Sequence, residues 1–321
     1  MSESDDRQSV VLIAGPTASG KSALAMDLAK ASDGVVINAD SMQVYSDLAI
    51  LTARPMAADM DAVPHRLYGT LPGDQVCSAG RWRALALEEA AHGLAAGKLP
   101  ILVGGTGLYL RAFEKGLSAV PEIPAAVRAE TRDLLAEIGA AALHARLAEA
   151  DSVMAARLAP GDGQRVARAW EVVTATGSSL AEWQAQEGET APYRCIKVCL
   201  LPEREALYAA CDRRLEAMID HGALEEVGAL LARNLDPGLP VMKALGVPEL
   251  AAHLRGERSL PEALALAQQA TRRYAKRQMT WLRHQFLGND PTVITLNAQY
   301  SESLQPELFA KIRQMLLTGP G

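Results

Sequence analysis

The chain of 321 residues has little of several features that would assign it quickly to a class. Aromatic residues make up only 4% of it while alanine and leucine dominate, so the sequence predicts mostly helices and no β-sandwich. No apolar run is long enough to span a bilayer, and residues 1–6 are acidic and polar, unlike a signal peptide. We therefore expect a cytoplasmic protein with no membrane partner.

The four cysteines, Cys77, Cys195, Cys199 and Cys211, lack a C-x-x-C pair and flanking histidines. This spacing favours neither a zinc site nor a disulfide framework. Cys195 and Cys199 fall in an apolar run, 195–201, where buried structural thiols are the expected reading.

The sequence also has no excess of positive charge. It contains 32 basic and 38 acidic residues, which gives a net charge of −6. This balance argues against a general, charge-driven nucleic-acid binder. A local basic surface remains compatible with it.

What the sequence does contain is a complete phosphate-loop motif, G-x-x-x-x-G-K-[ST]. Its members are Gly15, Pro16, Thr17, Ala18, Ser19, Gly20, Lys21 and Ser22. An apolar strand, 10–14, precedes the loop and a helix, 21–31, follows it, which is the context that the motif requires. Backbone N–H groups, the helix dipole and Lys21 would grip a polyphosphate, and Ser22 would hold a Mg²⁺ ion bridging the phosphates. The motif leaves open which phosphates are bound and for what chemistry.

Short apolar runs alternate with helical stretches over the first third of the chain. The expected strands are 10–14, 35–38 and 100–103, and the expected helices are 21–31, 78–96 and 107–114. Such alternation predicts an α/β fold, a parallel sheet flanked by helices as in phosphate-loop NTPases.

Residues 122–186 read as purely helical, interrupted by a Pro-Gly loop at 160–163. A strand at 195–201 and a helix at 203–220 then resume the α/β pattern, and further elements are expected at 261–284, 293–296 and 306–317. We therefore predict a discontinuous core, 8–120 and 190–321, with an all-helical insertion domain at 121–189.

Two residues follow expected strands, at the sheet edge where ligands of doubly wound folds gather. Asp40 could accept a proton from an attacking nucleophile or take part in magnesium coordination, and it could equally cap a local turn. Thr106, in the run Gly104-Gly105-Thr106-Gly107, could donate to a phosphate or position a nucleophile, and it could equally be an ordinary helix N-cap.

Several arginines suggest contacts with ligands or RNA. Gln164, Arg165 and Arg168 share one helix face, which suits RNA but could be a solvated face with salt bridges to Asp162 or Glu171. The basic stretch 272–284 interleaves aromatics that we expect to be buried. Arg213 and Arg214 could lean over the phosphates or simply pack locally.

The connection between the second strand and the next helix carries His65 and Arg66, and such a connection can fold over a ligand.

Together, these motifs resemble the bacterial tRNA dimethylallyltransferase family, over about residues 10–287. The matching segments are Gly15 to Ser22, Asp40-Ser41-x-Gln43-x-Tyr45, Pro64-His65-Arg66-Leu67, Val103-Gly104-Gly105-Thr106-Gly107-Leu108-Tyr109, Gln164-Arg165-x-x-Arg168-Ala169-x-Glu171 and Ala275-Lys276-Arg277-Gln278-x-Thr280-Trp281-Leu282-Arg283.

The resemblance implies transfer of a dimethylallyl group from dimethylallyl diphosphate to N6 of the adenosine immediately 3′ of the anticodon, with Mg²⁺ as cofactor. It makes Asp40 the base, with Thr106 and Arg214 completing the catalytic set and the phosphate loop holding the diphosphate. The residues that it assigns to tRNA binding are Asp40, Ser41, Met42, Gln43, Thr106, Arg128, Gln164, Arg165, Val166, Ala167, Arg168 and Lys243.

The chain departs from the family pattern on the tRNA side, where Ile50-Leu51 replaces the usual Ile-Gly and Val247-Pro248 replaces the common Gly-Tyr. We expect a monomer. The alternatives are a phosphate-loop small-molecule kinase, with Asp40 as base for a hydroxyl, and a nucleotide-binding switch that recruits RNA without chemistry.

Overall fold

The computed structural model describes residues 7–186, 188–288, 290 and 292–318. Within these residues, six parallel strands form one sheet in the order β3-β2-β4-β1-β5-β6. The strands are β1 Ser9–Ala14, β2 Gly34–Asn38, β3 His65–Arg66, β4 Leu99–Gly104, β5 Arg194–Leu200 and β6 Ile294–Leu296. The predicted α/β class with a parallel sheet is confirmed, and β1, which leads into the phosphate loop, lies between β4 and β5.

The four central strands, β1, β2, β4 and β5, are largely buried, which is why they read as continuous apolar runs. In β1, the side chains of Val10, Leu12 and Ala14 join one hydrophobic cluster, and those of Val11 and Ile13 join the other. All five side chains are fully buried. The alternation of a strand therefore divides this single run between two cores.

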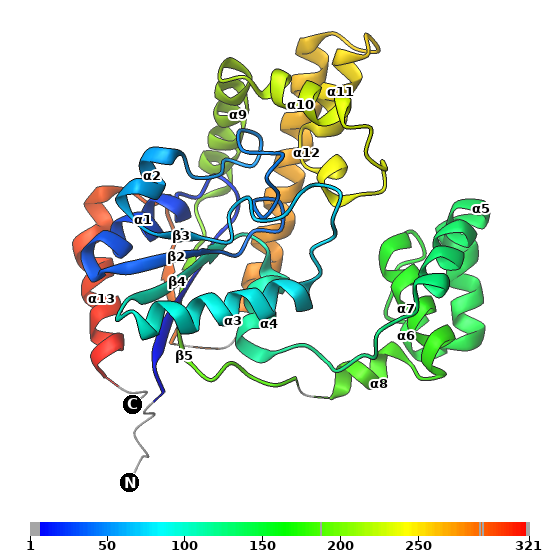
Figure 1. Cartoon of the computed structure of the whole chain (residues 1–321), viewed down its shortest axis with the longest axis horizontal. Coiled ribbons are helices and arrows are strands. Elements are labelled where there is room, and N and C mark those ends of the chain that lie inside the picture. Colours follow the sequence, from blue (N-terminus) through cyan, green and yellow to red (C-terminus); the bar gives the residue numbers. More distant parts are fainter. Residues whose placement is uncertain (1–6, 187, 289, 291, 319–321) are drawn as a thin grey trace. The chain divides into compact units, whose positions relative to one another are not determined.

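Helices cover both faces of the sheet. Two helices, α1 Lys21–Ser32 and α13 Gln305–Leu317, pack on the face with Val11 and Ile13 and lie side by side in Figure 1. The other face carries α3 Ala79–Ala95, α4 Gly107–Lys115, α9 Arg204–Asp220, α10 Ala223–Ala232, α11 Val247–Leu254 and α12 Leu260–Trp281. The remaining short elements of this unit are α2 Ala57–Ala62, the 3₁₀ helices η1 Pro240–Lys243 and η3 Glu302–Leu304, and a π-helical turn η2 Leu282–Leu287.

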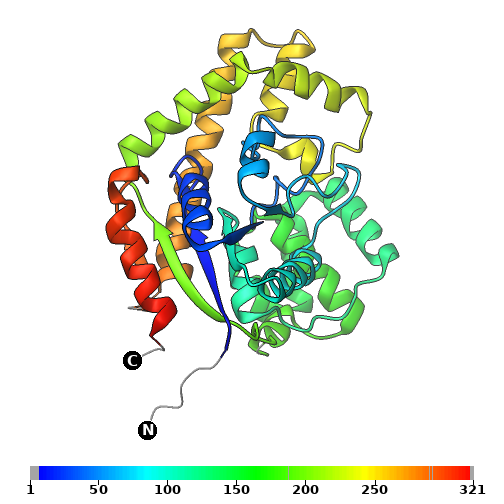
Figure 2. The ribbon, with the colours of Figure 1, turned by 60° about the vertical axis from the view of Figure 1, so that its left-hand side comes forward.

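The last helix is tied to the sheet by one arginine. Arg194 on β5 donates through its guanidinium to the carbonyls of Met315, Leu316 and Thr318, at 2.8, 3.0 and 2.6 Å. A cation that binds the free carbonyls at a helix C-terminus also complements the helix dipole. Figure 2 shows α13, in red, running alongside β5.

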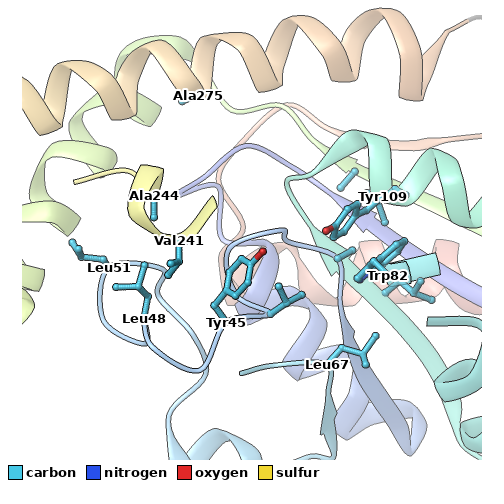
Figure 3. Close-up of a cluster of buried hydrophobic side chains, with 14 of the residues drawn as sticks. Tyr45, Leu48, Leu51, Leu67, Trp82, Tyr109, Val241, Ala244 and Ala275 are labelled. Carbon is cyan, nitrogen blue, oxygen red and sulfur yellow. The ribbon is translucent and has the colours of Figure 1, made fainter. Parts of the chain in front are cut away.

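The long connection between β2 and α3 is part of the core. Tyr45, Leu48, Leu51 and Leu67 bury their side chains in the larger cluster, together with Val241 and Ala244 of the segment around η1 (Figure 3). In the same cluster Trp82 stacks on Tyr109 with ring centroids 4.4 Å apart. Packing of this kind holds the connection in place against the sheet.

Within this connection, His65 and Arg66 form a short edge strand of the sheet. This strand is β3, where His65 pairs with Val36 of β2. Burial lowers the pKa of His65, whose Nδ1 lies 2.8 Å from the Val63 carbonyl, and Arg66 pairs with Glu89 of α3. The sequence did not predict this strand because two residues are too few for a recognisable period.

Residues 115–190 form a second compact unit, while residues 1–114 and 191–321 form the first. The described helices of the second unit are α5 Ala125–Ala150, α6 Ser152–Ala155, α7 Gly163–Thr176 and α8 Leu180–Ala185. They enclose a core of their own, which includes Leu143, Leu147 and Val172. The chain leaves and re-enters the first unit at neighbouring points, since the Ala191 amide donates to the Glu114 carbonyl at 3.2 Å. No helix in the described ranges is long and apolar enough to cross a membrane.

A buried lysine fixes that exit point. Lys197 on β5 is 8% exposed and contacts Glu114 at 3.1 Å and Asp290 at 2.6 Å. Burial alone would lower the pKa of Lys197, but the two carboxylates outweigh it and raise that pKa. Burial also opposes ionisation of Asp290, yet the hydrogen bonds from Lys197 and Thr292 hold the pKa of Asp290 at about 2.

We predict that Lys197→Met lowers the free energy of unfolding by about 2–3 kcal/mol, because two carboxylates lose their buried cation. Since the folded pKa of Asp290 lies below the ordinary value of 3.8, its contribution is present above pH 4 and is lost as the pH falls toward 2. Urea unfolding at pH 7 and pH 3 should show a smaller difference between wild type and variant at pH 3. Lys311→Met, which breaks an exposed pair with Glu307, is the control and should change little. An equal loss in both variants would contradict the prediction.

Candidate active site

The phosphate loop presents the start of α1 to an open anion site. Ala18 and Gly20 adopt left-handed backbone conformations, with φ of 63° and 88°, which turn successive peptide units. Gly20 occupies the N-cap position of α1 and no side chain caps the helix. The first N–H groups of α1 therefore remain available to an anion, which the helix dipole also favours.

Lys21 is held ready for an anion. Its ammonium donates to the Pro16 carbonyl at 3.3 Å across the loop. Burial lowers its pKa to about 8; Arg214 adds to this effect and Asp40 opposes it. A bound diphosphate would supply the negative charge that restores the protonated form.

The loop also contains a polar atom that the protein leaves without a partner. Ser19 is fully buried, and its hydroxyl forms no hydrogen bond with any described residue. A buried hydroxyl without a partner is destabilising by about 1–3 kcal/mol, so a ligand oxygen or a water would be bound favourably there.

Asp40 both caps a turn and faces the loop, so the two readings of this residue are compatible. Its amide donates to Asn38 Oδ1 at 2.8 Å, and its Oδ1 accepts from the Met42 amide at 2.9 Å. Asp40 and the loop residue Thr17 line one cavity. The carboxylate of Asp40 acts on the pKa of both Lys21 and Arg214, which places its negative charge beside the two cations.

Thr106 joins the turn of Asp40 to the end of β4. Its Oγ1 accepts from the Ser41 amide at 2.9 Å and donates to Ser41 Oγ at 3.3 Å. Its carbonyl, in contrast, begins α4 by accepting from the Tyr109 amide. The residue thus stands at the start of the helix while its hydroxyl is directed at the Asp40 turn.

The glycines around Thr106 make room for protein rather than for ligand. A Cβ on Gly105 would lie 2.2 Å from Gln278 Nε2, and one on Gly107 would lie 2.1 Å from the Trp281 ring. The close neighbours that require glycine at these two positions are therefore side chains of α12.

Gln278 is a site residue that the sequence reasoning did not single out. It is 6% exposed; its Oε1 accepts from the Thr17 amide and its Nε2 donates to the Gly105 carbonyl, both at 2.9 Å. One side chain on α12 thus links the phosphate loop to the loop that carries Thr106. The sequence signal that could have identified Gln278 is its position: it is a polar residue at helical spacing from Thr271 and Ala275, on the buried side of α12.

Arg214 contacts the loop from α9. Its guanidinium donates to Thr17 Oγ1, and burial lowers its pKa against the opposing effects of Cys211 and Asp40. Arg213, its neighbour in sequence, is exposed. Cys211 lies beside Arg214, where its thiol donates weakly to the Thr17 carbonyl at 3.9 Å, and burial raises the pKa of that thiol. All four cysteines are free thiols, and Cys199 is buried as expected while Cys195 is half-buried.

Four of these residues, Thr17, Asp40, Cys211 and Arg214, line a cavity of about 270 Å³. Thr17, Asp40 and Arg214 supply polar groups, while Met42, Leu51, Leu215, Met218 and Leu245 supply an apolar lining. Lys243 and Arg277 also line it, and both are exposed. The combination suits a ligand with an anionic head and a small apolar tail.

A magnesium ion fits the chemistry of the loop. Ser22, the predicted ligand, is exposed directly after Lys21. Among the described residues no group of three or more His, Cys, Asp or Glu side chains could form a metal site. Mg²⁺ commonly retains waters and binds through one or two protein oxygens together with ligand phosphates, so a hydroxyl beside a phosphate site is an appropriate donor.

The remaining predicted residues are distributed over both units. In the first, Gln43 uses its amide group to donate to the carbonyls of Thr52 and Ala53, at 2.7 and 3.0 Å, and so holds the local backbone. In the second, Arg128 and Gln164 are exposed. Arg165 pairs with Asp162 at 3.5 Å and Arg168 pairs with Glu171 at 3.3 Å. These are the two salt bridges expected if this helix face is a solvated surface.

Two neighbours in that run are less available. Val166 is fully buried in the core of the second unit, so its side chain cannot reach a ligand, and the expected contact is corrected to a packing role. Ala167 is half-buried and packs against the same core.

The basic stretch on α12 is partly neutralised within the unit, since Arg272 forms two contacts with Asp212 of α9, at 2.6 and 2.7 Å. The two aromatics expected to be buried there, Tyr274 and Trp281, are both half-buried, while Met279 between them is buried.

Comparisons with known proteins identify the family of the chain. The family model described as "IPP transferase" matches residues 43–285, and the model described as "Isopentenyl transferase" matches residues 8–76. The chain is 58% identical to the tRNA dimethylallyltransferase of Paramagnetospirillum magneticum, covering 97% of this chain and 98% of the relative. It is 56% identical to that of Rhodospirillum rubrum, covering 97% and 96%.

Solved structures give the same result. A full-length tRNA isopentenylpyrophosphate transferase from Bacillus halodurans has a TM-score of 0.69 at 32% identity, covering 97% of both chains. A eukaryotic dimethylallyltransferase crystallised acting on tRNA has a TM-score of 0.80 at 26% identity, covering 96% of this chain and 78% of that one. The relatives and the site favour neither the kinase nor the RNA-recruiting switch. The chain therefore belongs to the tRNA dimethylallyltransferase family.

Proposed function

We propose that the chain transfers a dimethylallyl group from dimethylallyl diphosphate to N6 of the adenosine 3′ of the anticodon in tRNA. The observation that carries the proposal is the single cavity that joins the phosphate loop, the Asp40 carboxylate and an apolar lining. An anion site at one side would hold the diphosphate and the apolar side chains would hold the prenyl tail. The names of the relatives supply the two substrates.

The reaction breaks a carbon–oxygen bond and forms a carbon–nitrogen bond. As the N6 amine attacks C1 of the prenyl group, the bonding electrons leave with the diphosphate, and the amine loses one proton to Asp40. Lys21, Arg214 and the N–H groups at the start of α1 stabilise the negative charge that grows on the leaving group. Thr106 acts through Ser41 by fixing the turn from which Asp40 projects.

We propose that Mg²⁺ is the cofactor. The Ser22 hydroxyl and the diphosphate oxygens would hold it, and when bound it would neutralise part of the leaving-group charge. We also propose that the chain acts as a monomer, and the tRNA substrate supports a cytoplasmic location.

One incubation tests the proposal. The protein, dimethylallyl diphosphate, Mg²⁺ and unmodified tRNA are combined, and the nucleosides are then analysed by mass. One adenosine should gain a C₅H₈ unit, at the position after the anticodon. Prenylation at another nucleoside, or none at all, would contradict the proposal.

Removing the base should abolish transfer and spare binding. Asp40→Asn keeps an oxygen that can accept from the Met42 amide but lacks the basic carboxylate. Single-turnover rates should fall by about 10²- to 10⁴-fold, the usual contribution of a general base, while the Kd for tRNA changes by less than about threefold. The assay is run at about pH 6.5, where the ammonium of Lys21 is protonated.

Asp61→Asn, on the exposed surface of α2, is the matched control for the loss of one carboxylate. A large loss of tRNA binding in Asp40→Asn, or a transfer rate equal to that of the control, would exclude the assigned role.

Donor capture should depend on the ionisation of Lys21. Because burial lowers its pKa to about 8 in the free protein, the ammonium is present below that pH and is lost above it. The value of kcat/KM for the donor should therefore decline as the pH rises through about 8, whereas kcat at saturating donor declines less, since bound diphosphate keeps Lys21 protonated. Lys21→Met keeps every other titratable group of the protein, so its kcat/KM for the donor should not decline over this pH range. An identical pH profile in both proteins would contradict the assignment.

The helical unit is proposed to contribute to tRNA binding through exposed arginines. Replacing Arg128 or Arg165 with Ala should raise the Kd for tRNA by about three- to tenfold and reduce its salt dependence, without changing diphosphate affinity. Arg146→Ala, an exposed arginine on α5 that is not predicted to contact tRNA, serves as control. Filter binding at several salt concentrations measures all three variants, and equal effects at Arg146 would refute a specific contact.

A further inference from the structure

A segment near the end of the chain lies against the outer side of the phosphate loop. This segment, residues 297–301, is here called the brace, and it connects β6 to η3. Gln299 Nε2 donates to the Ala18 carbonyl at 3.0 Å, and the Tyr300 amide donates to the Ser19 carbonyl at 3.1 Å. The Tyr300 hydroxyl adds a hydrogen bond of 2.8 Å to Asp27 on α1.

These contacts control which way the loop amides point. A peptide unit is planar and trans, so its carbonyl and its N–H point in opposite directions. The Ala18 carbonyl shares a peptide unit with the Ser19 amide, and the Ser19 carbonyl shares one with the Gly20 amide. By holding both carbonyls on the outer side, the brace fixes the orientation of the two peptide planes at the turn into α1.

The fit between brace and loop leaves no space for another side chain. A Cβ on Gly20 would lie 3.0 Å from Tyr300 Cβ and 3.1 Å from the Tyr300 backbone nitrogen. The motif glycine is thus required here both for its left-handed backbone, with φ of 88°, and for the close approach of the brace.

The brace is itself anchored at both ends. On one side, β6 pairs with β5 through Ile294 and Leu296. On the other, α13 buries Leu308, Phe309 and Ile312 against the sheet. An anchored segment can hold the loop in one arrangement before the ligand arrives, which spares the ligand the ordering cost.

We propose that the brace, through Gln299 and the backbone of Tyr300, is a positioning element that preorganises the phosphate loop for the diphosphate of the donor. The proposal rests on the proposed function, which places a diphosphate in this loop. The brace lies outside residues 43–285 and 8–76, the ranges that the family models match. Gln299 does not enter the chemistry and acts only through the Ala18 carbonyl.

The test measures binding of inorganic diphosphate in the presence of Mg²⁺ by calorimetry, using the full chain. Gln299→Met keeps the side-chain length but removes the donor, and we expect its Kd for diphosphate to rise about tenfold. The donor KM should rise by a similar factor, while kcat and the KM for tRNA stay within about twofold, because the loss precedes the chemical step.

Two further variants make the result interpretable. Tyr300→Phe removes the hydroxyl but keeps the backbone donor, so its diphosphate affinity should fall less than that of Gln299→Met. Gln314→Ala, at an exposed glutamine of α13 away from the loop, should match wild type. Melting temperatures without ligand identify any variant that loses affinity by unfolding.

The outcomes separate the two proposals. If wild type fails to bind diphosphate, the proposed function is wrong. If wild type binds and Gln299→Met binds equally well, the brace proposal is wrong while the function stands. A loss of kcat with an unchanged donor KM would also overturn the brace proposal.

Discussion

The orientation of the peptide units in the phosphate loop is the constraint on which the rest of the site depends. N–H groups can face an anion only if their carbonyls face elsewhere and find donors there. For the Pro16 carbonyl the donors are local, the Ser19 amide and Lys21. Distant parts of the chain provide the others: Cys211 binds the Thr17 carbonyl, and residues 299–300 bind the next two. Gln278 holds the Thr17 amide. The sheet, the helices behind it and the C-terminal segment thus converge on one short loop.

The charges around the cavity form an arrangement that is incomplete without ligand. Two partly buried cations, Lys21 and Arg214, face one carboxylate, Asp40, and desolvation lowers the pKa of both cations. The Asp40 carboxylate raises the pKa of both cations, but by less than burial lowers it. In the proposed reaction, a bound diphosphate would supply the negative charge that balances these two cations, and its release as product would remove that charge again. In the proposed reaction, the same carboxylate would accept the proton of the attacking amine.

Packing outside the cavity holds the Asp40 carboxylate in place relative to the phosphate loop. The connection after β2 is buried through Tyr45, Leu48 and Leu51, and Asn38 fixes its first turn by donating to the Asp40 carbonyl at 3.0 Å. Gln278 and Thr106 then link the ends of β1, β2 and β4. Polar side chains that connect strand ends are specific in a way that apolar packing alone is not, because their hydrogen bonds have direction.

The sequence by itself determined the elements whose signals are local. The strand–loop–helix of residues 10–31, the parallel α/β class and the positions of Asp40 and Thr106 after their strands follow from periodicity and short motifs, and the family followed from the order of those motifs. Only the tertiary structure decided what the neighbours of these residues are. It placed Gln278 against Thr17, set residues 299–300 beneath Ala18 and Ser19, made a strand of His65 and Arg66, and buried Val166. The physical reason is that such hydrogen bonds join residues far apart in the sequence, 261 positions for Thr17 and Gln278 and 281 for Ala18 and Gln299. They depend on how whole elements pack, so no local pattern of residues predicts them.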